Sequence, residues 1–272
     1  MRYAVTDKPP MNVFILALLL LATVQALAAP CAAEDFDTRV AGESECLIMR
    51  RYGPSDPKTL VVWLHGNVSS GGPANSHFRV AEKAAADFTA EKLLFVALVR
   101  PGYPDGTGAH SSGSDHGRAD NWPRAVVEEI GTVIDRLKTR FRPERVIMIG
   151  HSGGAAITAV LLGLRPDLAD AAILIGCPCD MVSWRQGRSR TPWTSEDPLS
   201  WTRNVKPSLK VIALTGDRDD TTAPVLAKTY IARLRENGID AVFQIVPEAG
   251  HIDILKAPAI NAATARLLRA AP

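Results

Sequence analysis

The stretch RVIMIGHSGGAAITAVLL, residues 145–162, decides the fold of this chain. Its first part, Arg145–Ile149, is a short apolar and β-branched run typical of a buried strand. Its last part, Ala155–Leu162, is typical of a helix that packs against a sheet. Ser152 lies between the two in the pattern G-x-S-x-G, so we expect it on a tight turn that lifts its hydroxyl above the sheet edge. The pattern favours a nucleophilic serine, and the plainer alternative is an ordinary turn between a strand and a helix.

Apolar runs and amphipathic segments alternate along the rest of the chain. We expect strands at residues 46–49, 60–64, 93–99, 171–175, 211–214 and 241–246, and helices near 78–88, 121–137, 224–237 and 257–268. Strands separated by helices indicate the α/β class, with a mostly parallel sheet covered on both faces. The 272 residues fit one such domain, expected over 29–272. In these sheets reactive groups gather at the carboxyl ends of the strands.

The N-terminal segment has the pattern of a secretory signal peptide. Arg2 and Lys8 precede an apolar run, Val13–Leu27, which is followed by small residues at 26–29. We therefore expect a signal peptide over residues 1–28 and a secreted or periplasmic protein. The alternative is an uncleaved anchor, but the run is shorter than a usual spanning helix, so no stable membrane insertion is expected after cleavage.

Charge and cysteine content narrow the class of protein. The net charge is +2, and no long basic stripe is present, so nucleic-acid binding is not expected. In an oxidising compartment the four cysteines favour disulfides, and the sequence leaves all three pairings open. Pairing Cys31 with Cys46 would tie down the mature N-terminus, whereas pairing Cys177 with Cys179 would close a very small, strained ring. C-x-C alone is not a zinc pattern, so we predict no metal site.

A serine nucleophile needs a base and a group that orients the base. His251 follows the last expected strand, and we favour it as the base; the alternative is an exposed loop histidine. Asp219, three residues past the Gly that ends the preceding strand, is the favoured acid. Asp220 and, less so, Asp180 are the alternatives, and an acidic turn that caps the next helix would explain those that do not face His251.

The oxyanion of a tetrahedral intermediate also needs hydrogen-bond donors. One expected donor is the backbone N–H of Gly153, the residue after the nucleophile. The other should come from the loop after the strand at residues 60–64, where we favour the backbone N–H of Asn67, with Val68 as the alternative.

From about Leu60 onward, the chain resembles the α/β-hydrolase superfamily. The matching motifs, in family order, are His65-Gly66, Arg100-Pro101-Gly102-Tyr103, Gly150-His151-Ser152-Gly153-Gly154, Gly216-x-x-Asp219 and Gly250-His251. The resemblance implies a Ser152–Asp219–His251 triad and hydrolysis through an acyl-enzyme, without metal or organic cofactor. The turn at residues 216–220 also resembles the dienelactone-hydrolase and prolyl-oligopeptidase branch. The chain departs from the former in its serine nucleophile and from the latter in having too little sequence before Leu60 for a propeller.

The segment 177–209 lies where this fold often inserts a small cap, after the sixth strand. It contains Trp184, Trp193 and Trp201 among the arginines Arg185, Arg188, Arg190 and Arg203. These rings could wall an acyl pocket, or they could pack the insertion onto the body. Trp184 and Tyr103 are the residues expected to contact substrate.

The sequence as a whole predicts an exported serine hydrolase. Its expected partner is a small-molecule ester, which makes a carboxylic-ester hydrolase the favoured activity. A serine peptidase or amidase is the alternative, and a non-catalytic binding protein is the third hypothesis.

Overall fold

The computed structural model describes residues 1, 31–186, 188 and 194–269. Beyond Met1, the predicted signal peptide lies outside the described residues, as do Arg190 and Trp193. Within the described ranges, no helix is long and apolar enough to span a membrane.

The predicted mostly parallel sheet is confirmed. Eight strands among the described residues pair in the order β1-β2-β4-β3-β5-β6-β7-β8. β1 and β2 are antiparallel to their neighbours, and all other pairs are parallel. The strands are β1 (Arg39–Ala41), β2 (Cys46–Tyr52), β3 (Thr59–Leu64), β4 (Leu93–Leu98), β5 (Arg145–His151), β6 (Ala171–Ile175), β7 (Lys210–Gly216) and β8 (Asp240–Val246).

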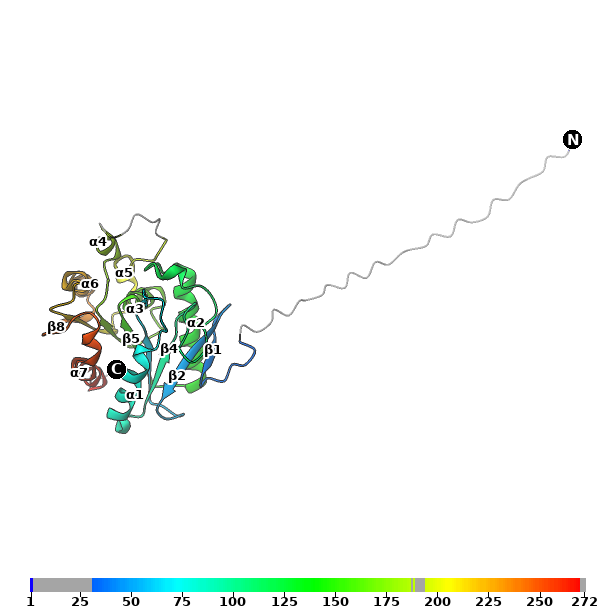
Figure 1. Cartoon of the computed structure of the whole chain (residues 1–272), viewed down its shortest axis with the longest axis horizontal. Helices are drawn as coiled ribbons and strands as arrows, with labels where there is room; N and C mark the ends of the chain where they lie inside the picture. The colour runs from blue at the N-terminus through cyan, green and yellow to red at the C-terminus, as the bar shows by residue number, and fades with distance from the viewer. Residues whose placement is uncertain (2–30, 187, 189–193, 270–272) are drawn as a thin grey trace.

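Helices cover both faces of this sheet (Figure 1). Because side chains alternate along a strand, β3 sends Leu60, Val62 and Leu64 to one core and Val61 and Trp63 to the other. The first core is closed by α2 (Arg124–Phe141), α3 (Gly153–Leu164) and α6 (Pro224–Glu236). The second is closed by α1 (Ser76–Asp87), α7 (Ala259–Arg269) and the short η4 (Asp253–Lys256).

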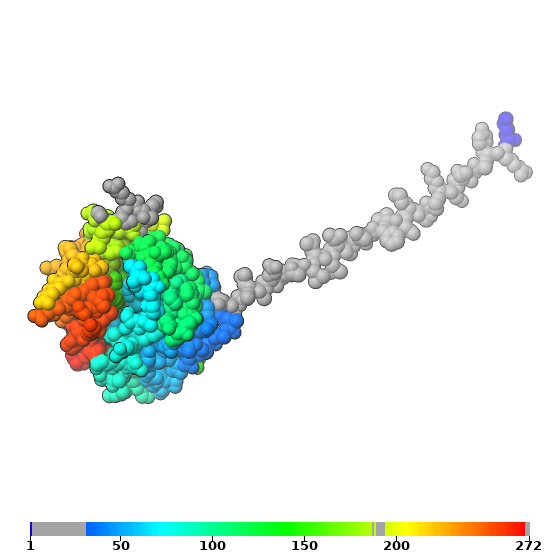
Figure 2. All heavy atoms as spheres, viewed as in Figure 1, coloured from blue at the N-terminus to red at the C-terminus, as the bar shows by residue number. Residues whose placement is uncertain are grey.

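Short helices occupy the loops at the carboxyl end of the sheet. The segment between β6 and β7 contains α4 (Met181–Arg185), α5 (Pro198–Trp201) and η3 (Thr202–Asn204). Figure 2 shows this segment in yellow-green at one end of the body, beside α6 and α2. Of two other short turns, η1 (Thr89–Glu91) precedes β4 at its amino end, and η2 (His116–Arg118) lies in the long loop between β4 and α2.

The four cysteines form two disulfides, Cys31–Cys46 and Cys177–Cys179. The first joins the segment before β1 to the start of β2, and it is one of the pairings that the sequence left open. The second closes the small ring between Cys177 and Cys179, with a Cα separation of 5.0 Å, within the usual range for a disulfide.

Candidate active site

Ser152 is the single residue that connects β5 to α3. Its backbone has φ 52° and ψ −121°, a conformation that costs energy for any residue with a Cβ and that is typical of a nucleophile elbow. Two contacts hold the strained turn. The N–H of Ser152 donates to Ile175 O at 2.8 Å, and a Cβ on Gly154 would lie only 2.4 Å from Leu64 O. The elbow is therefore packed directly against β3 and β6.

Asp219 and His251 meet where β7 and β8 end. His251 Nδ1 lies 2.8 Å from Asp219 Oδ2. The carboxylate, 5% exposed, also accepts hydrogen bonds from the N–H groups of Thr221 and Thr222 and from the Thr222 hydroxyl. Burial raises the pKa of Asp219, but the hydrogen bonds from His251 and Thr222 outweigh it, and the net pKa lies below the ordinary value. The carboxylate is therefore ionised and fixed.

The other two candidate acids lie elsewhere. Asp220 is exposed and accepts from the Thr221 hydroxyl at 3.3 Å. Asp180 caps α4 by accepting from the N–H and hydroxyl of Ser183. Among the three, Asp219 makes the contact with His251.

His151 connects the elbow to the His251 loop. Its Nε2 donates to His251 O at 2.9 Å, and burial lowers its pKa to about 4, so the ring is neutral at pH 7. A Cβ on Gly176, at the end of β6, would lie 3.1 Å from His251 Nδ1. Ser152 Oγ makes no hydrogen bond to His251 in the described part of the chain, and such contacts commonly shorten only when substrate binds.

The two residues expected to supply the oxyanion donors, Gly153 and Asn67, lie close together. A Cβ on Gly153 would be 2.8 Å from Asn67 Oδ1, and one on Gly66 would be 2.9 Å from Ser152 Cβ. The loop after β3 therefore presses against the elbow. His65 fixes this loop: its Nδ1 bonds Gly66 O at 2.6 Å, and its Nε2 accepts the N–H of Arg100 at 3.0 Å. Burial and the nearby Arg100 hold the pKa of His65 well below its ordinary value, which keeps the ring neutral.

A buried polar network surrounds the Asn67 side chain. Asn67 Oδ1 accepts from Arg100 Nη2 and, at 3.4 Å, from the Tyr103 hydroxyl, while Asn67 Nδ2 donates to Asp120 Oδ1. The Tyr103 side chain is only 2% exposed, so it lies below the surface, in contact with Asn67. Asp120 and the neighbouring Trp122 could not be recognised from the sequence as part of this network, because their loop carries no motif.

The tryptophans of the insertion make packing contacts. Trp184 Nε1 donates to Thr221 O at 2.7 Å, which ties α4 to the turn that contains Asp219. Trp201 Nε1 bonds Glu196, and its backbone lies where a side chain on Gly163 of α3 would be. These contacts support the packing alternative for both residues.

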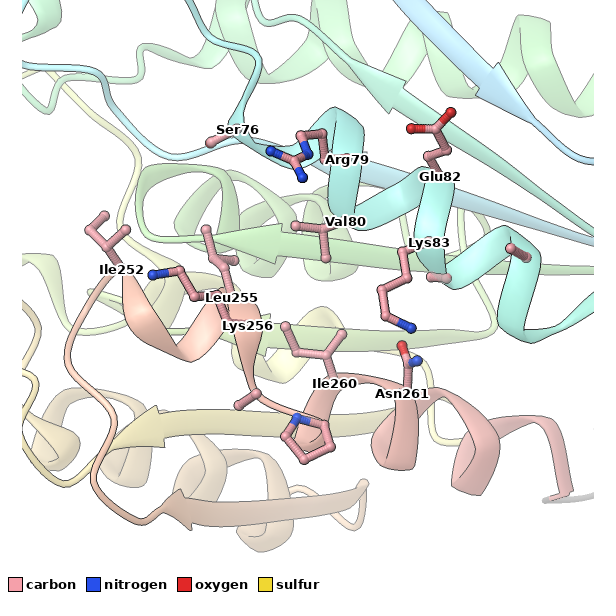
Figure 3. Close-up of a pocket in the computed structure, with 14 residues that line it drawn as sticks. Ser76, Arg79, Val80, Glu82, Lys83, Ile252, Leu255, Lys256, Ile260 and Asn261 are labelled. Atoms are coloured by element: carbon pink, nitrogen blue, oxygen red, sulfur yellow. The ribbon is translucent and has the colours of Figure 1, made fainter.

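One hollow lies beside the carboxyl edge of the sheet rather than on it. It has a volume of about 840 Å³ and lies between α1, η4 and the start of α7 (Figure 3). Ile252, the neighbour of His251, lines its edge, whereas none of the predicted site residues lines it. In the described ranges no group of three or more His, Cys, Asp or Glu side chains is placed to hold a metal ion.

A family model described as serine aminopeptidase, S33, matches residues 55–244. No curated protein matches the chain.

Solved structures share the fold at low sequence identity. Est1E from Butyrivibrio proteoclasticus, solved with ferulic acid bound, is 13% identical with a TM-score of 0.64, over 85% of this chain and 97% of that one. The esterase Pf2001 from Pyrococcus furiosus is 14% identical with a TM-score of 0.63, over 85% and 89%. The acylaminoacyl peptidase of Pyrococcus horikoshii is 14% identical with a TM-score of 0.64, over 86% of this chain and 41% of that one. The expected α/β-hydrolase fold is confirmed.

Proposed function

The chain belongs to the serine aminopeptidase family, S33, of α/β hydrolases, and from that premise we propose that it is an exported serine hydrolase of carboxylic esters. The observation that carries the proposal is the hydrogen bond between His251 and Asp219 at the carboxyl edge of the sheet, beside the strained Ser152 elbow.

The proposed mechanism assigns one role to each of these residues. Because Asp219 accepts the Nδ1–H of His251, the Nε2 atom is left unprotonated and can accept the Ser152 proton. Ser152 Oγ then attacks the ester carbonyl, and the imidazolium returns the proton to the leaving alcohol. Water, activated by the same imidazole, releases the acid from the acyl-enzyme and restores Ser152.

Two backbone donors would stabilise the oxyanion of each tetrahedral intermediate. The N–H of Gly153 is directed by the start of α3, and the N–H of Asn67 or Val68 comes from the loop that packs against the elbow. Donors fixed in advance cost no reorganisation when the negative charge develops, so they favour the transition state over the bound ester.

The preference for esters over peptides is the finer part of the proposal. The chain aligns with nearly the whole length of Est1E but with less than half of the acylaminoacyl peptidase. The near-complete coverage of Est1E and of the esterase Pf2001 is what supports small ester substrates. Export is supported by the signal-type segment at 1–28 and by two disulfides, which persist in oxidising compartments.

Hydrolysis of a series of p-nitrophenyl esters and peptide p-nitroanilides tests the substrate class. We expect the wild type to cleave the esters, with little activity on the anilides and none in Ser152→Ala. Anilide cleavage with a higher kcat/KM than any ester would favour the peptidase alternative. Export is tested separately by sequencing the N-terminus of the secreted protein, which should begin near Ala29.

A further inference from the structure

We propose that Arg100 is a positioning residue of the oxyanion hole, holding Asn67 in place and setting a fixed positive charge beside Gly153. This inference rests on the proposed function, since it concerns how the same site stabilises its transition state.

Arg100 touches both halves of the proposed oxyanion hole. Its Nη2 donates to Asn67 Oδ1, and its Nη1 lies 3.0 Å from where a Cβ on Gly153 would be. Gly153 and Asn67 supply the two favoured backbone donors. One guanidinium therefore lies against both, although it comes from a third loop, the one after β4.

The Asn67 side chain is clamped between opposite charges. A guanidinium can only donate hydrogen bonds and a carboxylate can only accept them. The amide thus presents its oxygen to Arg100 and its nitrogen to Asp120, and each of these bonds fixes the orientation of the other. With its side chain held at both ends, residue 67 has little freedom to rotate its backbone N–H away from the elbow.

The backbone of Arg100 is fixed as well. Its N–H donates to His65 Nε2, and His65 in turn bonds Gly66 O, directly before Asn67. The Tyr103 hydroxyl accepts from Arg100 Nη2 at 3.0 Å, and the guanidinium lies 4.9 Å from the centre of the Tyr103 ring. Contacts therefore hold Arg100 at its backbone N–H, at its guanidinium nitrogen Nη2 and at the guanidinium group that lies over the Tyr103 ring.

The charge of Arg100 is only partly compensated. The side chain is 2% exposed, and its Nε and Nη1 atoms are buried without a hydrogen-bond partner among the described residues. A buried arginine is normally paired with an acid, because an uncompensated charge is costly in a low dielectric. Here the amide of Asn67 stands between Arg100 and Asp120. A buried cation of this kind gains most from a negative charge that develops close to it.

This arrangement makes a specific kinetic prediction. The oxyanion exists in the transition state and not in the bound ester, so losing the clamp should lower kcat and leave KM nearly unchanged. We expect Arg100→Gln to lower kcat by about a hundredfold, the range seen when one oxyanion donor is lost, with KM within about threefold of wild type. Arg100→Lys, which keeps the charge but cannot bond in a fork, should recover part of the loss.

The test combines kcat and KM for a p-nitrophenyl ester with the inhibition constant of an arylboronic acid, which forms an anionic tetrahedral adduct on the serine. In Arg100→Gln the boronic acid should lose affinity by the same factor as kcat. Arg165→Gln is the matched control, because Arg165 pairs with Asp135 at the far end of α3, and it should match wild type. If Arg100→Gln does not fold, Tyr103→Phe removes only the hydroxyl that bonds Arg100 and Asn67, and a smaller loss of kcat and boronic-acid affinity is expected.

Two outcomes would overturn the inference. One is unchanged kcat in a folded Arg100→Gln protein, or in Tyr103→Phe where that is the variant that folds. The other is a raised KM with unchanged kcat, which would make Arg100 a substrate-binding residue. Failure of the proposed function is seen separately, as a wild type that neither cleaves the ester nor binds the boronic acid, and it removes this inference with it.

Discussion

His251 Nδ1 and Asp219 Oδ2 lie 2.8 Å apart, although 32 residues separate them along the chain. Asp219 follows β7 and His251 follows β8, and these parallel strands are neighbours in the sheet. Parallel strands end at the same edge, so the loops after them meet there. The contact fixes which ring nitrogen carries the proton and leaves the other one available to a nucleophile.

Replacing Asp219 with Asn should lower kcat by about 10³–10⁴-fold, because the imidazole loses the carboxylate that sets its tautomer and stabilises its charged form. Asp220→Asn is the matched control and should remain close to wild type, since Asp220 is exposed and its carboxylate accepts from the neighbouring Thr221 hydroxyl. Steady-state hydrolysis of a p-nitrophenyl ester measures both. The opposite pattern would assign the role to Asp220.

Two motif glycines should respond differently to an added methyl group. A Cβ on Gly153 would lie 2.6 Å from Trp122 Cζ2 and 2.8 Å from Asn67 Oδ1, whereas one on Gly250 would have no neighbour closer than 3.8 Å. Gly153→Ala should therefore displace an oxyanion donor and lower kcat by about a hundredfold or more. Gly250→Ala should retain nearly full activity. Similar activity in both variants would show that the crowding around Gly153 has no role in catalysis.

Stability should fall as the pH is lowered from about 6.5 toward 4. Burial lowers the pKa of His77 to about 3 and of His151 to about 4, and it holds the pKa of His65 well below its ordinary value. In the unfolded chain these histidines titrate near 6.5, so the unfolded state takes up more protons as the pH falls. Within this window each of the three histidines lowers the free energy of unfolding by about 1.4 kcal/mol for each unit that the pH falls.

Urea unfolding between pH 7.5 and 4.5 measures this slope. His77→Gln should make it shallower by about one histidine's share, whereas His110→Gln, an exposed position, should leave it unchanged. A free energy of unfolding that does not vary across this range would contradict neutral burial of the three rings.

The Cys31–Cys46 disulfide should contribute more to stability than the Cys177–Cys179 disulfide. The first spans 15 residues and restricts the unfolded chain, at about 3 kcal/mol in the chain-entropy account, and the second spans only two. The double variant Cys31→Ala/Cys46→Ala should therefore unfold at lower urea concentration than Cys177→Ala/Cys179→Ala. The reverse order would mean that the small ring holds the β6–β7 segment more strongly than chain entropy allows.

The sequence predicted the sheet well because its buried strands are continuous apolar runs. Residues 60–64 and 171–175 match β3 and β6 to within a residue at each end. It missed β1, whose three residues are too few for a period-two pattern, although they pair with β2. The ends of helices moved by up to four residues: α7 begins at Ala259 rather than Ala257, and α2 spans Arg124–Phe141 rather than 121–137.

Within the site, motif spacing predicted the residues on the rim but not their cross-links. Ser152, Asp219 and His251 follow strands, so topology alone places them together. The Asn67–Asp120 contact joins loops 53 residues apart, and Asp120 lies in a Gly- and Ser-rich stretch with no periodic pattern. The direction of Trp184 was equally open, because either wall or packing contacts suit a ring at that position.

Labelling by a fluorophosphonate, followed by mass mapping of the modified peptide, tests the proposed nucleophile most directly. We expect one adduct per folded wild-type chain, located on Ser152, and loss of esterase activity in proportion to labelling. Ser152→Ala should not label. A folded wild type that fails to react, or a Ser152→Ala variant that labels equally, would contradict the serine mechanism.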